Sequence, residues 1–296
     1  MSKVDKSQYT KSEWKIVREQ RRQEKNNSKL QKSVVDEEVV PQKTVVPNDK
    51  KYIVCLKHGD KYSAEYVNKL HSMVKRNCTH DYEFVCFTEN SEGINTSIRI
   101  EPLPKLPVAG WWYKPMFFNP NLQLQGTILF FDLDVIIQND LTPIITYNME
   151  RPTKMKSWWQ DPRPMETRRF KLSHGAYTNG SCKVWSDDQC ECIWNDVLEN
   201  QEKIWFTYTD GTDNYHSWKW GRYGEDLWDY FPSWMAYSWN RGRSWDEDDL
   251  NVAKYRENCI VCVFNIDLLP FEDASRGSTK QDSLTHPELL KHWRGE

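Results

Sequence analysis

Two carboxylates separated by one residue, Asp132 and Asp134, directly follow a continuously apolar run over residues 127–131. Such a run is typical of a central strand that is buried on both faces. Side chains alternate along an extended segment, so both carboxylates project to the same side while Leu133 returns to the core. Two converging carboxylates repel each other unless a cation lies between them. Oxygen ligands of this kind suit Mg²⁺ or Mn²⁺, which can clamp the phosphates of a nucleoside diphosphate.

The residues ahead of this pair predict the elements that position it. Apolar strands over 52–56 and 83–88 flank a helix from Ser63 to Arg76. Ser63 is a plausible N-cap, and the apolar face of the helix is formed by Val67, Leu70 and Val74. This order predicts a β-α-β unit with parallel strands, and therefore an α/β fold.

The connection to the acidic pair is shorter and less regular. A strand-like piece over 97–100 precedes a proline-rich turn, and residues 111–118 predict a short helix. The Gly126 turn then leads into the strand over 127–131. Asp132 and Asp134 would therefore lie at the carboxyl end of a central strand, where open α/β sheets bind ligands.

A change in composition divides the chain. Residues 1–50 carry 12 basic and 8 acidic side chains and are rich in Gln, Ser and Asn. Their large apolar residues are too few to form a packing stripe. We interpret residues 1–50 as a charged mobile arm and residues 51–296 as the folded domain.

Composition also excludes several classes of protein. A net charge of -3 gives no reason to expect a nucleic-acid partner, and no apolar run is long enough to span a bilayer. We expect a cytoplasmic protein, and its eight cysteines are interpreted as reduced thiols. The spacing disfavours the alternative of a zinc site made by Cys190, Cys192, Cys259 and Cys262, because the first pair has the wrong gap and the second lies in a strand-like run.

Beyond the Asp-x-Asp pair, several motifs in order over residues 51–265 resemble the GT-A fold glycosyltransferases that use nucleotide sugars. They are residues 57–62, 88–89, 110–114, 179–181 and 224–226. The chain looks most similar to a bacterial and viral branch related to family 8. The resemblance implies a GT-A mixed sheet flanked by helices, and transfer of a hexose-type sugar from a nucleoside diphosphate sugar, with UDP favoured, to a carbohydrate or glycoconjugate acceptor.

The resemblance also implies roles for individual residues. Asp132 and Asp134 would hold the metal, with Asp132 also touching the ribose. Glu225 and Asp226 resemble the acidic pair that binds the sugar hydroxyls or serves as base. The other implied donor contacts are Lys57, Glu89, Lys114, Asn179 and Gly180.

One part of the pattern departs from that family. A His-Gly pair after a late strand usually supplies a third metal ligand, whereas here the strand-like run over 261–264 leads into Asn265 and Asp267. Asn265 could coordinate the metal through its amide oxygen, or Asp267 could substitute for it.

The tryptophans, one acidic run and the histidines give further expectations. The chain has 15 tryptophans, and those within residues 205–245 lie in a stretch that reads as loop and would suit an acceptor platform. The acidic run over 246–249 is interpreted as a solvated loop. The seven histidines show no metal-binding spacing, although His174 precedes a glycine.

Two rival functions remain open. A haloacid-dehalogenase-like phosphatase also places Asp-x-Asp after an apolar strand, but its motif continues with Gly and begins near the start of its domain. Here Val135 follows the pair and a β-α-β unit precedes it. A non-catalytic carbohydrate-binding protein is the second rival, suggested by the tryptophans and the missing His. Binding of a donor without turnover would distinguish it from an enzyme.

Overall fold

The computed structural model describes residues 50–104, 106, 110–147, 150–158, 177–186, 188–208, 211–221, 224–239, 241–247, 253–264 and 286–295. Seven strands form its main sheet in the order β3-β2-β1-β4-β7-β6-β8. Their bounds are β1 Lys51–Lys57, β2 Glu83–Thr88, β3 Arg99–Pro102, β4 Thr127–Phe131, β6 Thr153–Lys156, β7 Thr178–Ser186 and β8 Asp229–Tyr230. The arm predicted over 1–50 lies outside the described residues, apart from Lys50.

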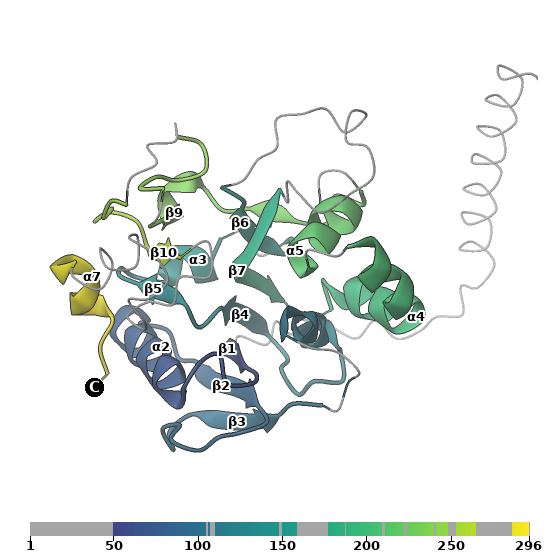
Figure 1. The fold of residues 1–296 in the computed structure, drawn as a ribbon, viewed down its shortest axis with the longest axis horizontal. Helices are drawn as coiled ribbons and strands as arrows, with labels where there is room; N and C mark the ends of the chain where they lie inside the picture. The colour runs from purple at the N-terminus through teal and green to yellow at the C-terminus, as the bar shows by residue number, and fades with distance from the viewer. Residues whose placement is uncertain are drawn as a thin grey trace, which may run out of the picture. The chain divides into compact units, whose positions relative to one another are not determined.

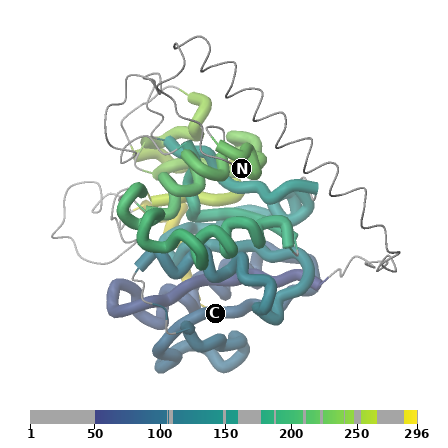
Figure 2. Tube along the Cα trace, turned by 90° about the vertical axis from the view of Figure 1, so that its right-hand side faces the viewer, coloured from purple at the N-terminus to yellow at the C-terminus, as the bar shows by residue number. Residues whose placement is uncertain are grey.

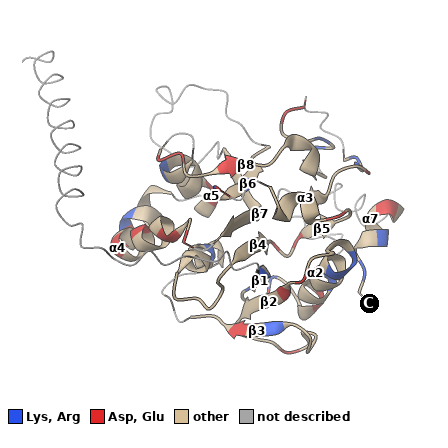
Figure 3. Ribbon diagram, turned by 180° about the vertical axis from the view of Figure 1, so that it is seen from behind, with Lys and Arg blue, Asp and Glu red and all other residues tan. Residues whose placement is uncertain are grey.

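The first four strands of this order are parallel to one another, and β7 runs antiparallel to both β4 and β6. The prediction of a mixed α/β architecture with β1 and β2 parallel is therefore confirmed. All five residues of β4 are buried, as expected of a strand in the middle of the sheet. Strand β3 lies at the sheet edge and carries both kinds of charge (Figure 3), which suits an edge strand because charge discourages further pairing.

Helices cover both faces of the main sheet (Figure 1). Their bounds are α2 Ala64–Asn77, η2 Gly110–Phe118, α3 Thr142–Ile145, α4 Glu191–Thr207, α5 Thr212–Tyr215, η4 His216–Trp220, η5 Ser233–Met235 and α7 Pro287–His292. Helix α2 packs on one face, and η2, α4 and α5 pack on the other. Figure 2 is viewed from the side of α4 and shows this helix lying across the strands.

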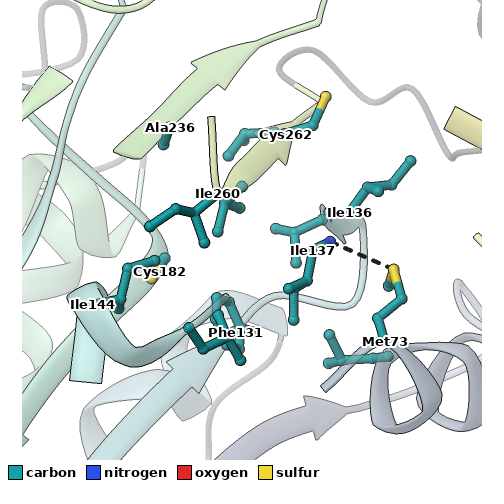
Figure 4. Packing of buried hydrophobic residues seen from close by; sticks show 14 of the residues in the cluster. Met73, Phe131, Ile136, Ile137, Ile144, Cys182, Ala236, Ile260 and Cys262 are labelled. Atoms are coloured by element: carbon teal, nitrogen blue, oxygen red, sulfur yellow. Dashed lines mark hydrogen bonds between the residues drawn. The ribbon is translucent and has the colours of Figure 1, made fainter. Parts of the chain in front are cut away.

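A three-stranded sheet adjoins the α2 side, in the order β5-β10-β9. Its strands are β5 Val135–Ile137, β9 Ala236–Ser238 and β10 Val261–Val263. The close view in Figure 4 shows Ile137 beside Met73 of α2, and the Ile137 N–H lies 3.4 Å from the Met73 sulfur. Because β5 begins one residue after Asp134, this packing fixes the direction in which the chain leaves the acidic pair.

Helix α2 agrees closely with its prediction. Ser63 stands at the N-cap position with extended backbone, although its side chain makes no capping hydrogen bond, and Val67, Leu70 and Val74 are buried. The strand predicted over 97–100 begins later, as β3. The predicted helix over 111–118 is a 3₁₀ helix that contains Pro115, a residue without the N–H that an α-helix would use.

The interpretation of residues 205–245 as loop was wrong. This stretch holds the end of α4 together with α5, η4, β8, η5 and β9. The indoles of Trp218, Trp220, Trp228, Trp239 and Trp245 are buried. Burying large aromatic side chains drives this Gly-containing segment to fold despite its polar composition.

The cysteines and helices bear on three further expectations. All eight cysteines are free, which confirms the interpretation as thiols. The alternative of a zinc site finds no support, since the described residues hold no group of three or more metal-ligating side chains. No helix within the described ranges has the length and apolar character needed to cross a bilayer.

Candidate active site

Asp132 and Asp134 follow the last residue of β4, at the carboxyl end of the parallel strands. The Asp132 N–H donates to the carbonyl of Ser181 on β7 at 2.9 Å, which extends the pairing of the two strands by one residue. Leu133 is buried in the apolar cluster under α2, while the acidic side chains on either side of it remain partly exposed. The predicted alternation at this pair is therefore confirmed.

Lys114, on the 3₁₀ helix η2, is the direct partner of Asp132. Its Nζ lies 2.6 Å from one carboxylate oxygen and 2.9 Å from the other. Burial opposes the charge of Lys114, but Asp132 and Asp213 outweigh it and the pKa of Lys114 is raised. The ammonium is therefore held as a cation beside the acidic pair.

Asp134 has a neutral hydrogen-bond donor as its partner. The Tyr62 hydroxyl, from the loop between β1 and α2, donates to Asp134 Oδ2 at 2.8 Å. Burial and the neighbouring charge of Asp132 raise the pKa of Asp134 to about 6, although Tyr62, Lys61 and Lys114 oppose the shift. Removing this carboxylate from water beside a second one has a free-energy cost that a bound cation would offset.

The two carboxylates fit a hard divalent cation by the chemistry of their oxygen donors. No third His, Cys, Asp or Glu joins them to complete a metal-ligating group within the part of the chain that the structure describes. Asn265, the residue expected to complete the coordination, and Asp267 both lie outside the described residues.

Asp213, at the start of α5, was not anticipated from the sequence. Its charge acts on Lys114, and its Oδ1 lies 3.8 Å from the Nζ of Lys154 on β6. It also packs against the backbone of Gly180, where the Cβ of any larger residue would lie 2.7 Å from Asp213 Oδ1. The only signal in the sequence was an acidic residue close after Gly211 in a polar stretch, and that pattern occurs several times in this chain.

Two further lysines are buried on the same face of the sheet. The Lys154 side chain is fully buried, and its Nζ lies 3.1 Å from Nδ1 of His216. Lys183 of β7 places its Nζ 4.2 Å from the centre of the Phe130 ring. Burial lowers the pKa of both lysines, to about 8 for Lys154. The apolar run that precedes Asp132 gave no indication that buried lysines lie beside its strand.

Asn179 and Gly180 lie on β7, next to these groups. Asn179 is mostly buried, and its Oδ1 accepts the N–H of Ser181 at 2.9 Å. Since the Ser181 carbonyl binds the Asp132 N–H, Asn179 supports the backbone that fixes the acidic pair. The structure thus brings the regions of Lys114, Asp132 and residues 179–181 together.

This chain is similar to known proteins in structure and not in sequence. No protein-family model matches the chain, and no curated protein matches its sequence. Among solved structures, an active-site mutant of LgtC matches with a TM-score of 0.52 and 14% identity, over 78% of this chain and 93% of LgtC. The glycosyltransferase GlyE of Streptococcus pneumoniae matches with a TM-score of 0.53 and 10% identity, over 82% of this chain and 63% of GlyE.

A third match is the bifunctional glycosyltransferase WbbM, with a TM-score of 0.50 and 10% identity, over 84% of this chain and 52% of WbbM. Identities this low show the arrangement of the chain and not its substrates. The chain has the GT-A fold. The predicted fold class is therefore confirmed, and in this GT-A domain Asp132 and Asp134 stand at the carboxyl edge of the central strand, as expected.

Two of the remaining predicted donor contacts lie at the neighbouring ends of β1 and β2. Lys57 is the last residue of β1, is buried, and is aligned with Thr88 of β2. Glu89 accepts the Gly59 N–H at 2.5 Å. Burial of Glu89 raises its pKa, but this hydrogen bond and the nearby His58 outweigh the effect and the pKa is lowered. Both residues lie at the same edge of the GT-A sheet as the acidic pair.

Glu225 and Asp226 lie elsewhere on the GT-A domain, between η4 and β8. Their N–H groups donate to the carbonyls of Lys219 and Gly221, and Arg151 approaches the Asp226 carboxylate at 3.8 Å. Asp226 is exposed and has a left-handed backbone with φ 51°. Within the described residues no hydrogen bond or ion pair joins this pair to Lys114, Asp132 or Asp134, so its catalytic role stays a prediction from the resemblance.

Proposed function

We propose that this protein is a metal-dependent glycosyltransferase that moves a hexose-type sugar from a nucleoside diphosphate sugar, with UDP favoured, to a carbohydrate or glycoconjugate acceptor. The observation that carries the proposal is the pairing of Asp132 with Lys114 beside the partly buried Asp134, at the carboxyl edge of a GT-A sheet. The solved structures that share this fold are glycosyltransferases, which supports a transferase over the phosphatase alternative.

Asp132 and Asp134 would hold Mn²⁺ or Mg²⁺, with Asn265 as the proposed additional ligand. When bound, the ion supplies charge that stabilises the leaving diphosphate. Lys114 adds a fixed cation at the same place, and its ion pair with Asp132 keeps it there before the donor arrives. Preorganised charge of this kind is usually the largest single contribution to catalysis.

The sugar of the donor would lie toward β7 and α5. Asn179 and Gly180 bound this space, and Gly180 leaves room that a side chain would fill. Asp213 supplies a carboxylate there that can accept hydrogen bonds from sugar hydroxyls. Lys57 and Glu89 would flank the nucleoside, while Glu225 and Asp226 remain the alternative acidic pair at the transfer centre.

Trp111 is the proposed stacking residue for the acceptor sugar. Its indole is 54% exposed, and its Nε1 would lie 2.5 Å from a Cβ built on Gly211, two residues before Asp213. The face of an exposed indole packs well against the C–H face of a sugar. Most of the tryptophans within residues 205–245 are buried, so Trp111 replaces that set as the proposed platform.

Thermal stability measured with a panel of nucleoside diphosphates and nucleotide sugars tests the proposal. A ligand that binds only the native state raises the melting temperature. We expect the largest rise with UDP or a UDP-hexose in Mn²⁺, no rise in chelator, and release of UDP from the donor on prolonged incubation. No metal-dependent shift with any nucleotide would contradict the proposal, and a shift without UDP release would favour a carbohydrate-binding protein.

A further inference from the structure

An open pocket lies away from Asp132 and Asp134, against the small sheet. Its volume is about 530 Å³, within the usual range for small-ligand sites. The wall is formed by η5 and by the loops before and after residues 248–252, and includes Ser233, Trp234, Asp246, Lys254, Arg256 and Glu257. None of these residues belongs to the proposed transfer site.

Strand β10 gives the pocket its position. Val263, the last residue of β10, pairs with Val135, which follows Asp134. The first residue of β10 pairs with Ile137, and the pocket residues up to Cys259 precede it. The pocket is therefore beyond the opposite end of β10 from the acidic pair, and the three residues of β10 alone span about 7 Å at about 3.3 Å per residue.

Trp234 presents an indole to this pocket from a fixed backbone. Its side chain is 52% exposed, although most tryptophans of the neighbouring segment are buried. The next residue, Met235, donates its N–H to Pro232 at 3.1 Å and accepts the Ile260 N–H at 2.9 Å. These two hydrogen bonds fix the backbone of the turn, so the Trp234 indole is exposed by an ordered segment and is available for stacking.

The polar groups of the pocket are also held in place. The Ser233 hydroxyl donates to the Asp246 carboxylate, and Arg256 pairs with Glu247. The Asn139 amide donates to the carbonyls of Glu257 and Cys259 of the pocket wall, each at 2.7 Å. A ligand would thus meet donors and acceptors that are already ordered, which lowers the entropic penalty of binding.

We propose that this pocket is a second carbohydrate-binding site, separate from the transfer centre, that takes a neutral oligosaccharide. An exposed indole beside ordered carboxylate, hydroxyl and guanidinium groups provides both a stacking face and hydrogen bonds for sugar hydroxyls. Three acidic side chains, Asp246, Glu247 and Glu257, face two basic ones, Lys254 and Arg256. This balance disfavours a phosphorylated or otherwise anionic ligand.

Binding of the full-length protein to immobilised neutral tri- to hexasaccharides of glucose, galactose and N-acetylhexosamines tests this site. The measurement is made in chelator and without nucleotide, so that the proposed transfer site is not engaged. We expect retention by at least one oligosaccharide and at least a tenfold loss of affinity in Trp234→Ala. Phe206→Ala, an equally drastic change at an 88% exposed ring on α4, should bind as the wild type does.

Asp246→Asn provides a second variant that keeps the shape of the side chain, and we expect it to weaken the same binding. Retention of none of the oligosaccharides, or equal binding by Trp234→Ala and the wild type, would overturn the proposal. Melting temperature with UDP and Mn²⁺ is measured separately on each variant. A normal nucleotide response with no oligosaccharide binding refutes this site alone, and the reverse pattern refutes the transferase.

Discussion

The two faces of the main sheet have very different chemistry. On the α2 side, β7 contributes Cys182 and Val184 to a cluster of buried apolar residues that continues into the small sheet. On the other side the same strand contributes Lys183, which interacts with Lys154 and His216 and lies over the rings of Phe118 and Phe130. A fold gains stability from the first arrangement, whereas buried amines reduce it. We therefore expect the residues that bind the donor and support transfer to lie on the charged face.

The largest expected effect comes from Asp134→Asn, which removes one charge at the edge of the charged face. The fold should persist because the side chain is not part of the apolar core and an amide can keep the Tyr62 hydrogen bond. Metal-supported donor turnover should fall by about 10²-fold or more, since a bound ion contributes several kcal/mol to the transition state. The rate of UDP release and the Mn²⁺-dependent melting shift measure this. Loss of folding with unchanged nucleotide affinity would contradict the assignment.

Asp213 and Asp226 offer a matched pair of acidic side chains. We expect Asp213→Asn to lower kcat by roughly 10- to 100-fold, because its carboxylate acts on Lys114 and adjoins Gly180. Asp226→Asn should have a smaller effect, since this exposed side chain is near Arg151.

Gly180→Ala tests the same space without touching a charge, because its Cβ would displace the Asp213 carboxylate. Rates of UDP release by Asp213→Asn, Asp226→Asn and Gly180→Ala show which of the two carboxylates acts in turnover. A greater loss in Asp226→Asn than in Asp213→Asn would restore the assignment drawn from the resemblance.

Neighbouring residues of β7 test the two faces directly. Lys183→Met should raise the free energy of unfolding by about 1–3 kcal/mol, because it removes a buried amine that has no ion-pair partner among the described residues. The same change should slow turnover severalfold, since Lys183 interacts electrostatically with Lys114 and Asp132 of the proposed transfer site.

Val184→Ala is the control on the apolar face. It should lower the free energy of unfolding by roughly 1–3 kcal/mol and leave turnover per folded molecule unchanged. Urea denaturation and UDP release measure both quantities. A Lys183→Met protein that is less stable and fully active would show that the two faces do not differ as we infer.

The apolar face is also the part that could be predicted from the sequence. The strand over 127–131, the helix ending in Lys75 and Arg76, and the placement of Leu133 all follow from local periodicity and alternation. The charged face required knowledge of distant pairing. Lys114, Asp213 and Lys154 come from η2, α5 and β6, and no local pattern brings these elements together. The loop interpretation of residues 205–245 failed because buried tryptophans, distributed without regular spacing, fold that segment by tertiary contacts.

Lys154 gives the most specific effect, through pH. Burial, only partly opposed by Asp213, lowers its pKa from the ordinary value of 10.5 to about 8. Between these two values the unfolded chain binds a proton that the folded protein does not, so the free energy of unfolding contributed by this group rises with pH. Lys154→Met removes a buried amine and its titration. The excess of its free energy of unfolding over that of the wild type should therefore shrink between about pH 8 and 10.5. Urea denaturation at several pH values measures that difference. A constant difference would mean that Lys154 keeps the same protonation in both states, and that the charged face holds it as a cation.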